Sequence, residues 1–292
     1  LWITDKKEDA VAQYQQAIAG APEDHQLYVE IGNLLAEMGA QERRIKVLEG
    51  APASARTHTP FIQALASGYV DTKRFADAAA LLANNTFTSG EGEDAALGLY
   101  RKAHLGLARE FQQAGEHLQA AAEFAEATEY PRNFGVGRPA MQSQAREYVS
   151  VARELDLAGK REEAQRWWQR AATEELNPPT QPEEPWSEHY FYKAVALEHV
   201  GRQVEARALY ERLARLNNEQ LMLDSEPWPP SGAIRFVLAG AGLKALGRTT
   251  EARVALERAL KMDPQNELAL SQLSELKDGM RTSKLINRQG RR

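Results

Sequence analysis

The stretch that decides the fold is residues 108–127, AREFQQAGEHLQAAAEFAEA. On both sides of Gly115, its alanines and its large residues recur at steps of three, four and seven positions, which is the spacing of a single helix face. Glycine adopts a left-handed turn at little cost, and alanines let two backbones approach closely. The stretch therefore predicts two helices that are joined at Gly115 and packed along an alanine-rich seam.

The same pattern surrounds three later glycines, Gly159, Gly201 and Gly247. In each case an alanine comes five positions after the glycine and a large residue comes nine positions after it. The alanines that we expect to be buried in these seams are Ala120, Ala164, Ala206 and Ala252. A lone helix pair cannot cover its own apolar face, so consecutive pairs must stack on one another.

Weaker copies of the pattern come earlier in the chain. The full set of registry points is 5, 39, 73, 115, 159, 201 and 247, and the shortest spacing between neighbouring points is 34 residues. At the third point Lys73 stands where a glycine is usual, which puts the geometry of that turn in question. A period of 34, paired small residues and helix-stopping prolines such as Pro22 and Pro264 resemble the tetratricopeptide repeat.

This resemblance implies an all-α protein, a right-handed α-solenoid of helix hairpins with one concave and one convex surface. We expect a half repeat at residues 1–22, six hairpins over about 23–264 and a capping helix at about 265–278. Together they make one solenoid over residues 1–279, followed by a basic tail at 280–292. Extra residues between hairpins predict long loops at 86–94, 130–140, 174–186 and 217–232.

From Ile31 onward, the order of several unusual segments resembles the C-terminal helical repeat region of bacterial proteins that contain domain of unknown function 5107. The segments that carry this resemblance are 39–44, Phe87 with 91–92, 100–104, 130–138 and the later hairpins. The resemblance implies that the chain is the C-terminal part of a larger bacterial protein with a carbohydrate-related role and a β-rich N-terminal region. It supplies no catalytic residue.

The composition of the 292-residue chain excludes several kinds of protein. No cysteine is present, so disulfides, thiolate metal sites and cysteine nucleophiles are excluded. The formal net charge of -5 gives no overall attraction to nucleic acid, and no apolar run reaches the roughly 18 residues of a membrane-spanning helix. No two histidines have the spacing of a helical zinc site.

We therefore expect no cofactor, no metal, no nucleic-acid partner and no membrane span. We also expect a cytoplasmic location. The chain begins at Leu1 rather than at a methionine, which suggests that its N-terminus is truncated.

Four cations are candidates for a binding groove. In tetratricopeptide solenoids the first helix of each hairpin lines the concave surface, and the third and fourth full hairpins carry Lys102, Arg109, Arg146 and Arg153 on this face. They can hold a carboxylate or an acidic peptide through charge-assisted hydrogen bonds. The alternative is a set of solvated charges paired with the nearby Glu110, Glu147 and Glu154.

The lysine-and-asparagine clamp by which some repeat proteins hold a peptide carboxylate is not reproduced in this sequence. Asn33 is present, but Val29 stands where the clamp needs a lysine.

Two loop tryptophans, Trp186 and Trp228, are candidates for contact with a ligand such as a sugar ring. Beside Trp186 lies the acidic pair Glu183 and Glu184, and a glycosidase needs two carboxylates at a defined separation. Nothing else in the sequence organises this pair, so we name no catalytic residue.

Two functions are consistent with these patterns. The first is a non-catalytic scaffold that docks a protein or peptide, the missing N-terminal region of the same polypeptide, or another copy of the chain. The second is a helical subdomain of a carbohydrate-active enzyme that contributes to a substrate cleft. An open row of hairpins favours the scaffold, whereas a closed ring with converging acids favours the enzyme.

Overall fold

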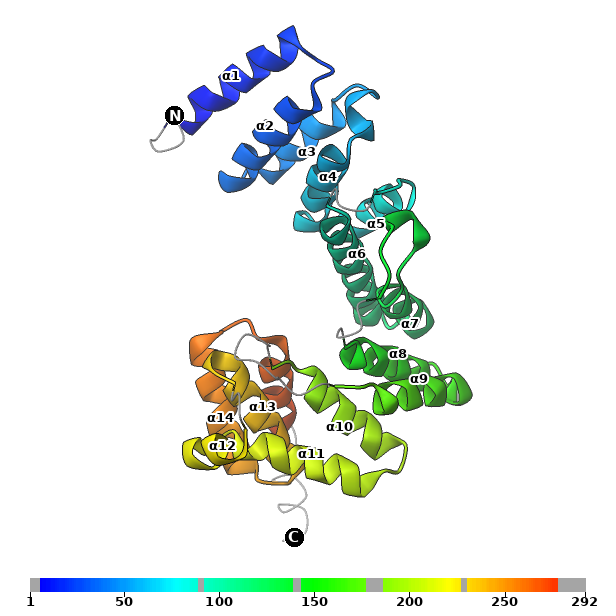
Figure 1. Cartoon of the computed structure of the whole chain (residues 1–292), viewed down its shortest axis with the longest axis vertical. Helices are drawn as coiled ribbons and strands as arrows, with labels where there is room; N and C mark the ends of the chain where they lie inside the picture. Colours follow the sequence, from blue (N-terminus) through cyan, green and yellow to red (C-terminus); the bar gives the residue numbers. More distant parts are fainter. Residues whose placement is uncertain (1–5, 89–91, 139–142, 177–185, 227–229, 278–292) are drawn as a thin grey trace, which may run out of the picture. The chain divides into compact units, whose positions relative to one another are not determined.

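The protein is helical throughout the part of the chain that the computed structural model describes (Figure 1). That part comprises residues 6–88, 92–138, 143–176, 186–226 and 230–277. Within these ranges helices are joined by turns and short loops, and no strand occurs. The prediction of an all-α fold built from consecutive helix hairpins is confirmed.

The first half of the chain contains a single helix followed by three hairpins. Its helices are α1 (Lys7–Gly20), α2 (His25–Glu37), α3 (Gln41–Glu49), α4 (Thr59–Asp71), α5 (Phe75–Ala83), α6 (Glu93–Ala114) and α7 (His117–Glu126), with the short 3-10 helices η1 (Ala55–Thr57) and η2 (Arg132–Phe134). The hairpins are α2–α3, α4–α5 and α6–α7; α2–α3 packs on α4–α5, which in turn packs on α6–α7.

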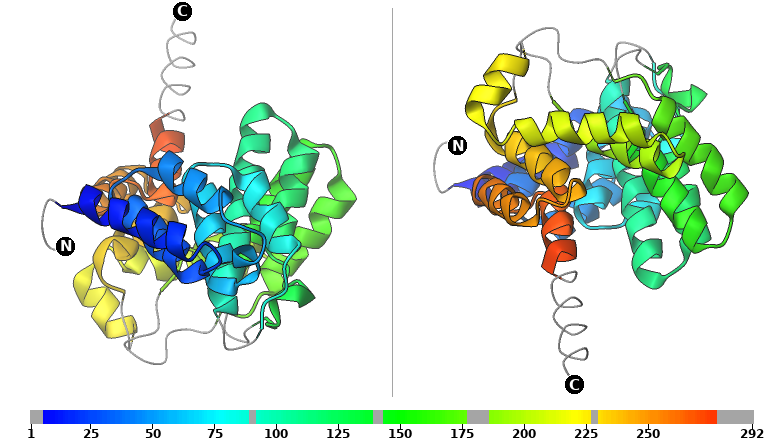
Figure 2. Two further views of the ribbon diagram at one scale, coloured as in Figure 1. Left: turned by 90° about the horizontal axis from the view of Figure 1, so that it is seen from above. Right: turned by 90° about the horizontal axis from the view of Figure 1, so that it is seen from below.

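The second half contains three further hairpins, which Figure 2 shows from two sides. Its helices are α8 (Ala145–Leu157), α9 (Arg161–Thr173), α10 (His189–His199), α11 (Gln203–Arg215), α12 (Glu219–Ser225), α13 (Gly232–Ala245) and α14 (Thr249–Met262). The hairpins are α8–α9, α10–α11 and α13–α14, with the short α12 between the last two. Residues 267–277 form a last helix after α14.

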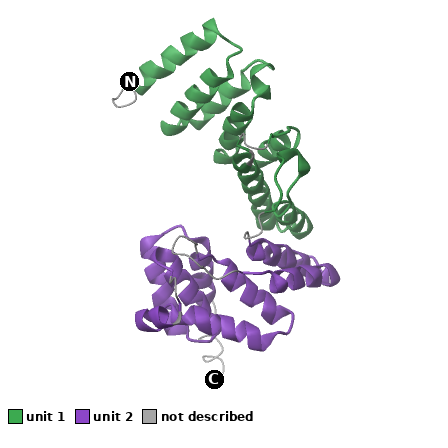
Figure 3. Ribbon diagram, viewed as in Figure 1, with its two compact units in different colours: residues 1–140 green, residues 141–292 purple. Residues whose placement is uncertain are grey.

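These halves are two compact units, Leu1–Ala140 (unit 1) and Met141–Arg292 (unit 2), coloured separately in Figure 3. Each unit is described by itself. A single continuous solenoid over residues 1–279 stays a prediction.

Each hairpin turns through one residue in the left-handed conformation. These residues are Gly39, Lys73, Gly115, Gly159, Gly201 and Gly247, and their φ angles lie between 60° and 82°. In all six turns the next N–H donates to the carbonyl four positions before the turn residue, at 2.7–2.9 Å, which caps the first helix. Lys73 therefore makes the same turn as the glycines, with a φ of 60°, although its Cβ crowds the backbone in this conformation.

The predicted seams lie inside the hairpins. Their alanines Ala120, Ala164, Ala206 and Ala252 are 0–1% exposed. The large residues four positions further on, Phe124, Trp168, Tyr210 and Leu256, are buried as well. Full burial of such a side chain stabilises the fold by about 1.5–3 kcal/mol, so the seams are a main source of stability.

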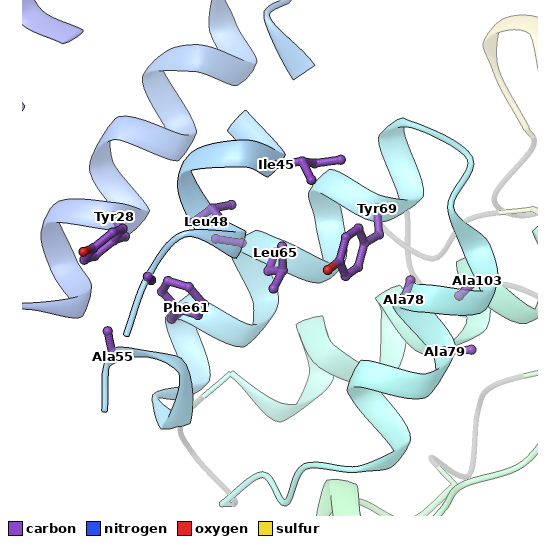
Figure 4. Packing of buried hydrophobic residues seen from close by; sticks show 12 residues of the cluster. Tyr28, Ile45, Leu48, Ala55, Phe61, Leu65, Tyr69, Ala78, Ala79 and Ala103 are labelled. Carbon is purple, nitrogen blue, oxygen red and sulfur yellow. The ribbon is translucent and has the colours of Figure 1, made fainter. Parts of the chain in front are cut away.

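One apolar cluster, shown in Figure 4, joins the three hairpins of unit 1. Tyr28 of α2 meets Phe61 of α4 edge to face, with ring centroids 6.1 Å apart. Leu48 of α3 and Leu65 of α4 join them, and Ala103 brings α6 into the same cluster. The core thereby fixes the positions of the first helices α2, α4 and α6 relative to one another.

Two of the predicted loops are packed structure in their described parts. The ring of Phe87 stacks on that of Phe134 at 5.1 Å, and Tyr100 of α6 leans against Phe134 at 5.2 Å. The Asn133 amide donates to the carbonyls of Leu82 and Asn85 at 3.1 and 2.7 Å. Several segments behind the second family resemblance therefore meet in one cluster, and packing explains why these residues occur together.

Candidate docking site

The first helices of the unit 1 hairpins line an open surface hollow of about 530 Å³. Its walls come from α2, α4 and α6. The lining residues are Val29 and Asn33 on α2, Pro60, Gln63, Ala64 and Ser67 on α4, Ala95, Gly98, Leu99 and Lys102 on α6, and Arg44 on α3. Because the hairpins stack in register, equivalent first-helix positions come together on this one surface.

The hollow carries positive charge. Lys102 is exposed, and among the residues that the structure describes its ammonium group has no ion-pair or hydrogen-bond partner. Neither aspartate nor glutamate occurs among the lining residues just named. A carboxylate that enters the hollow therefore meets a cation and no competing acid.

Polar side chains of α2 and α4 also line the hollow. Asn33 is exposed, and its amide offers both a donor and an acceptor. The Gln63 amide donates to the Gly92 carbonyl at 2.5 Å, which ties α4 to the start of α6. The Ser67 hydroxyl donates to Asp71 at 3.5 Å. The side-chain amide of Asn33 can accept a hydrogen bond from an N–H group of an extended peptide and donate one to its C=O group.

Arg44 forms a fixed part of the wall. Its side chain is 4% exposed and pairs with Asp71 at 2.8 Å, while a second nitrogen donates to the Ala64 carbonyl at 3.0 Å. These bonds hold α3 against α4. A buried charge that is paired in this way is costly to disrupt, so Arg44 stabilises the hollow.

The lysine beside Asn33 comes from an unexpected helix. The sequence predicts no lysine there, because Val29 occupies the clamp position. In the structure Val29 and Asn33 line the same hollow as Lys102, which belongs to the hairpin two further along the chain. A sequence motif confined to one helix could not reveal this arrangement.

The four predicted cations divide between the units. Lys102 and Arg109 are both exposed on α6 in unit 1, and only Lys102 lines the hollow. Arg146 and Arg153 are on α8 in unit 2, where Arg153 is exposed. A groove that contains all four cations stays a prediction.

Arg146 is already paired. One of its nitrogens lies 2.6 Å from Glu267 and another lies 3.4 Å from Glu188. The sequence suggested a neighbour such as Glu147 as its partner, but the carboxylates in contact belong to Glu188, which immediately precedes α10, and to Glu267 of the last helix.

Of the two loop tryptophans predicted to contact a ligand, the structure describes Trp186, which is buried. Trp186 is 6% exposed, with the Tyr190 ring at 4.7 Å and the Arg212 guanidinium at 4.9 Å. Its ring is covered by protein, so we do not expect it to stack on a sugar. Trp228 and the acidic pair Glu183 and Glu184 lie outside the described residues.

The same described ranges hold neither a candidate metal site nor a candidate membrane span. There, no three His, Asp or Glu side chains are grouped so that they could hold a metal ion. No helix in these ranges has the length and apolar character needed to cross a membrane.

Sequence reasoning missed Gln63, Ser67 and Arg44 as parts of the hollow. For Ser67 a signal was present, because it precedes its turn residue Lys73 by six positions, just as Asn33 precedes Gly39. For Gln63 and Arg44 the sequence holds no comparable signal, since their places depend on packing between hairpins.

Comparison with known proteins identifies the repeat. Residues 239–266, which include α14, match the family model described as tetratricopeptide repeat. The chain contains a tetratricopeptide repeat. The preceding hairpins turn through a residue in the same left-handed conformation.

Solved tetratricopeptide structures also resemble the chain. One, from Parabacteroides merdae, is 16% identical, with 93% of this chain and 92% of that chain covered and a TM-score of 0.44. Another, the C-terminal part of a tetratricopeptide protein from Cytophaga hutchinsonii, is 13% identical, with 92% and 95% covered and a TM-score of 0.43. No curated protein matches the chain in sequence.

Proposed function

We propose that this chain is a non-catalytic docking scaffold whose unit 1 hollow binds an extended polypeptide segment with an acidic group. The observation that carries the proposal is the exposed ammonium of Lys102, in a hollow that no carboxylate lines. An acidic side chain or a terminal carboxylate gains a charge-assisted hydrogen bond at this place. Tetratricopeptide repeats generally bind peptides or proteins, which supports the same conclusion.

The rest of the hollow suits an extended segment. Val29 and Leu99 offer apolar contact, and Asn33 can bond to a peptide backbone. A volume of about 530 Å³ is within the usual range for pockets that hold small ligands, so it accepts a few residues rather than a folded domain. Because Lys102 is exposed, we expect modest affinity that falls as salt is added.

The test is a titration of the full chain with a hexaglutamate peptide and with a neutral hexaglutamine peptide. We expect the acidic peptide to bind more tightly, and Lys102→Gln to weaken it by roughly fivefold, the effect of losing about 1 kcal/mol. Lys46→Gln is the matched control, because Lys46 is an exposed lysine on the second helix α3, outside the hollow.

An equal loss of affinity for hexaglutamate in Lys102→Gln and Lys46→Gln would show that the peptide is attracted by the overall charge of the chain. It would contradict a specific binding site at Lys102. In an NMR titration with the acidic peptide, we expect the backbone chemical shifts of Asn33 and Leu99 to change. Unchanged shifts at both residues would contradict binding in the hollow.

The larger bacterial protein implied by the second resemblance offers one source for the acidic segment, its own preceding region. Co-purification of this chain with that region tests the intramolecular version. We expect association in the tens of micromolar range that Lys102→Gln weakens. No association at this concentration would count against docking within one polypeptide.

A further inference from the structure

A second open surface hollow, here called the unit 2 hollow, lies among α11, α12 and the turn between α13 and α14. Its volume of about 420 Å³ is within the usual range for pockets that hold small ligands. Arg215 and Ala214 of α11 line it, together with Leu221 of α12 and with Leu246, which precedes the turn residue Gly247. The unit 2 hollow therefore combines charged and apolar walls, and it shares no lining residue with the hollow of unit 1.

The charges of the unit 2 hollow leave one cation open. Arg248 donates to both carboxylate oxygens of Glu251, at 2.8 and 2.7 Å, and Glu211 accepts from Arg207 at 3.0 Å. Arg215, in the last turn of α11, is exposed, and its guanidinium has no ion pair or hydrogen bond to any residue that the structure describes. Both acids of the lining are thus neutralised by arginines, so a carboxylate is the group that complements Arg215.

The apolar wall on α12 is held in place at both ends of the helix. At its start the Asn218 side chain accepts the Leu221 N–H at 3.1 Å, and Met222 is 5% exposed. Just after the helix, the buried Glu226 accepts from two Arg212 nitrogens, each at 2.6 Å. Leu221 is nevertheless 51% exposed. Because these contacts fix the helix, Leu221 keeps its apolar surface at the hollow.

We propose that the unit 2 hollow docks an extended segment of a partner protein in which a carboxylate adjoins an aliphatic side chain. The carboxylate pairs with Arg215, whose planar guanidinium can bond to both of its oxygens. The aliphatic side chain packs on Leu221 and Leu246, and the Asn217 amide lines the same hollow and can bond to the backbone of the segment. This second docking surface goes beyond the proposed function of unit 1 and does not depend on it.

The test is a titration of the full chain carrying Lys102→Gln, which removes the open lysine of unit 1, with a hexapeptide of alternating leucine and glutamate. We expect a further Arg215→Gln to weaken binding by roughly two- to fivefold, as for the loss of an exposed ion pair. We expect Leu221→Ala to weaken it by a similar factor, because apolar contact is lost. Both side chains are exposed, so neither substitution disturbs the core.

Each variant has a matched control outside the unit 2 hollow. Leu223→Ala removes a leucine that is 56% exposed on the same helix, and Arg166→Gln removes an exposed arginine from the second helix α9. We expect both controls to bind the peptide as tightly as the Lys102→Gln chain does. Losses in the controls equal to those in Arg215→Gln and Leu221→Ala would overturn the proposal.

A second peptide separates the two contacts. A hexapeptide of alternating leucine and glutamine keeps the leucines and lacks the carboxylates, and we expect it to bind more weakly and to be insensitive to Arg215→Gln. Weaker binding of the acidic peptide in Arg215→Gln but not in Leu221→Ala would indicate a site for any anion and would overturn docking of a polypeptide segment. Because these variants lie in unit 2 and the unit 1 site is tested through Lys102, the two sites can fail separately.

Discussion

The two units use the same kind of position on a first helix in opposite ways. Lys102 precedes its turn glycine Gly115 by thirteen residues, and Arg146 precedes Gly159 by the same number. In unit 1 the lysine lines an open hollow, whereas in unit 2 the arginine is bound by Glu188 and Glu267. Repeat register therefore places a cation, but helices that arrive from elsewhere decide whether it is available.

The largest expected effect concerns how tightly the helices of each unit pack. A Cβ at Gly242 of α13 would lie 2.8 Å from both the Leu213 Cβ and the Tyr210 carbonyl of α11, whereas a Cβ at Gly98 of α6 meets nothing within 4 Å. We expect Gly242→Ala to lower the free energy of unfolding by about 1–3 kcal/mol.

Gly98→Ala is the matched control, because it is the same substitution inside a helix. We expect it to leave stability unchanged or to raise it by about 0.5–1 kcal/mol, since alanine is the better helix former. Urea unfolding measures both variants, and equal effects would contradict the difference in packing.

The turns give the next largest effect. Lys73 is left-handed in unit 1, while the turns of unit 2 have glycine at Gly159, Gly201 and Gly247. A non-glycine residue in this conformation is strained by about 1–2 kcal/mol. We expect Lys73→Gly to raise the free energy of unfolding by about 1 kcal/mol and Gly159→Lys to lower it by a similar amount. Thermal unfolding of the two reciprocal variants checks this, and a loss of stability in Lys73→Gly would contradict it.

A smaller effect is a pH dependence of unit 2. Burial is the main cause that lowers the pKa of His189 from its ordinary 6.5, and its Nδ1 accepts the Arg146 backbone N–H at 3.2 Å. The charged groups that act on its pKa are Glu147, Arg146 and Glu174. A lowered histidine pKa means that the unfolded chain takes up the proton first. Stability should therefore fall as the pH drops below 6.5 toward the pKa of the folded state.

Tryptophan fluorescence follows this change, because the tryptophans after Trp2 are Trp167, Trp168, Trp186 and Trp228, all in unit 2. Glu188, whose pKa is raised by burial, acts in the opposite sense, since its contribution is lost as the pH rises. The prediction therefore concerns the difference in the pH dependence of stability between the wild type and His189→Gln. We expect the variant to lose less stability between pH 7 and pH 5, and parallel curves would contradict the role of His189.

The hairpins and their seams were predictable because they depend on local spacing. A helix face repeats every few residues, so Ala120 and Ala252 could be assigned to buried seams, and both are buried. The hollow was predictable only in part. Lys102 could be placed on a first helix, but its proximity to Asn33 depends on how three hairpins pack.

The sequence by itself determined that this chain consists of helix hairpins with glycine turns and alanine seams, because the residues involved are neighbours along the chain. It even marked the turn at Lys73, although only the structure shows that the lysine adopts the glycine conformation. Tertiary structure alone decided which cations are open. Arg146 is paired because a carboxylate 121 residues away lies beside it, and no local pattern encodes a contact at that distance.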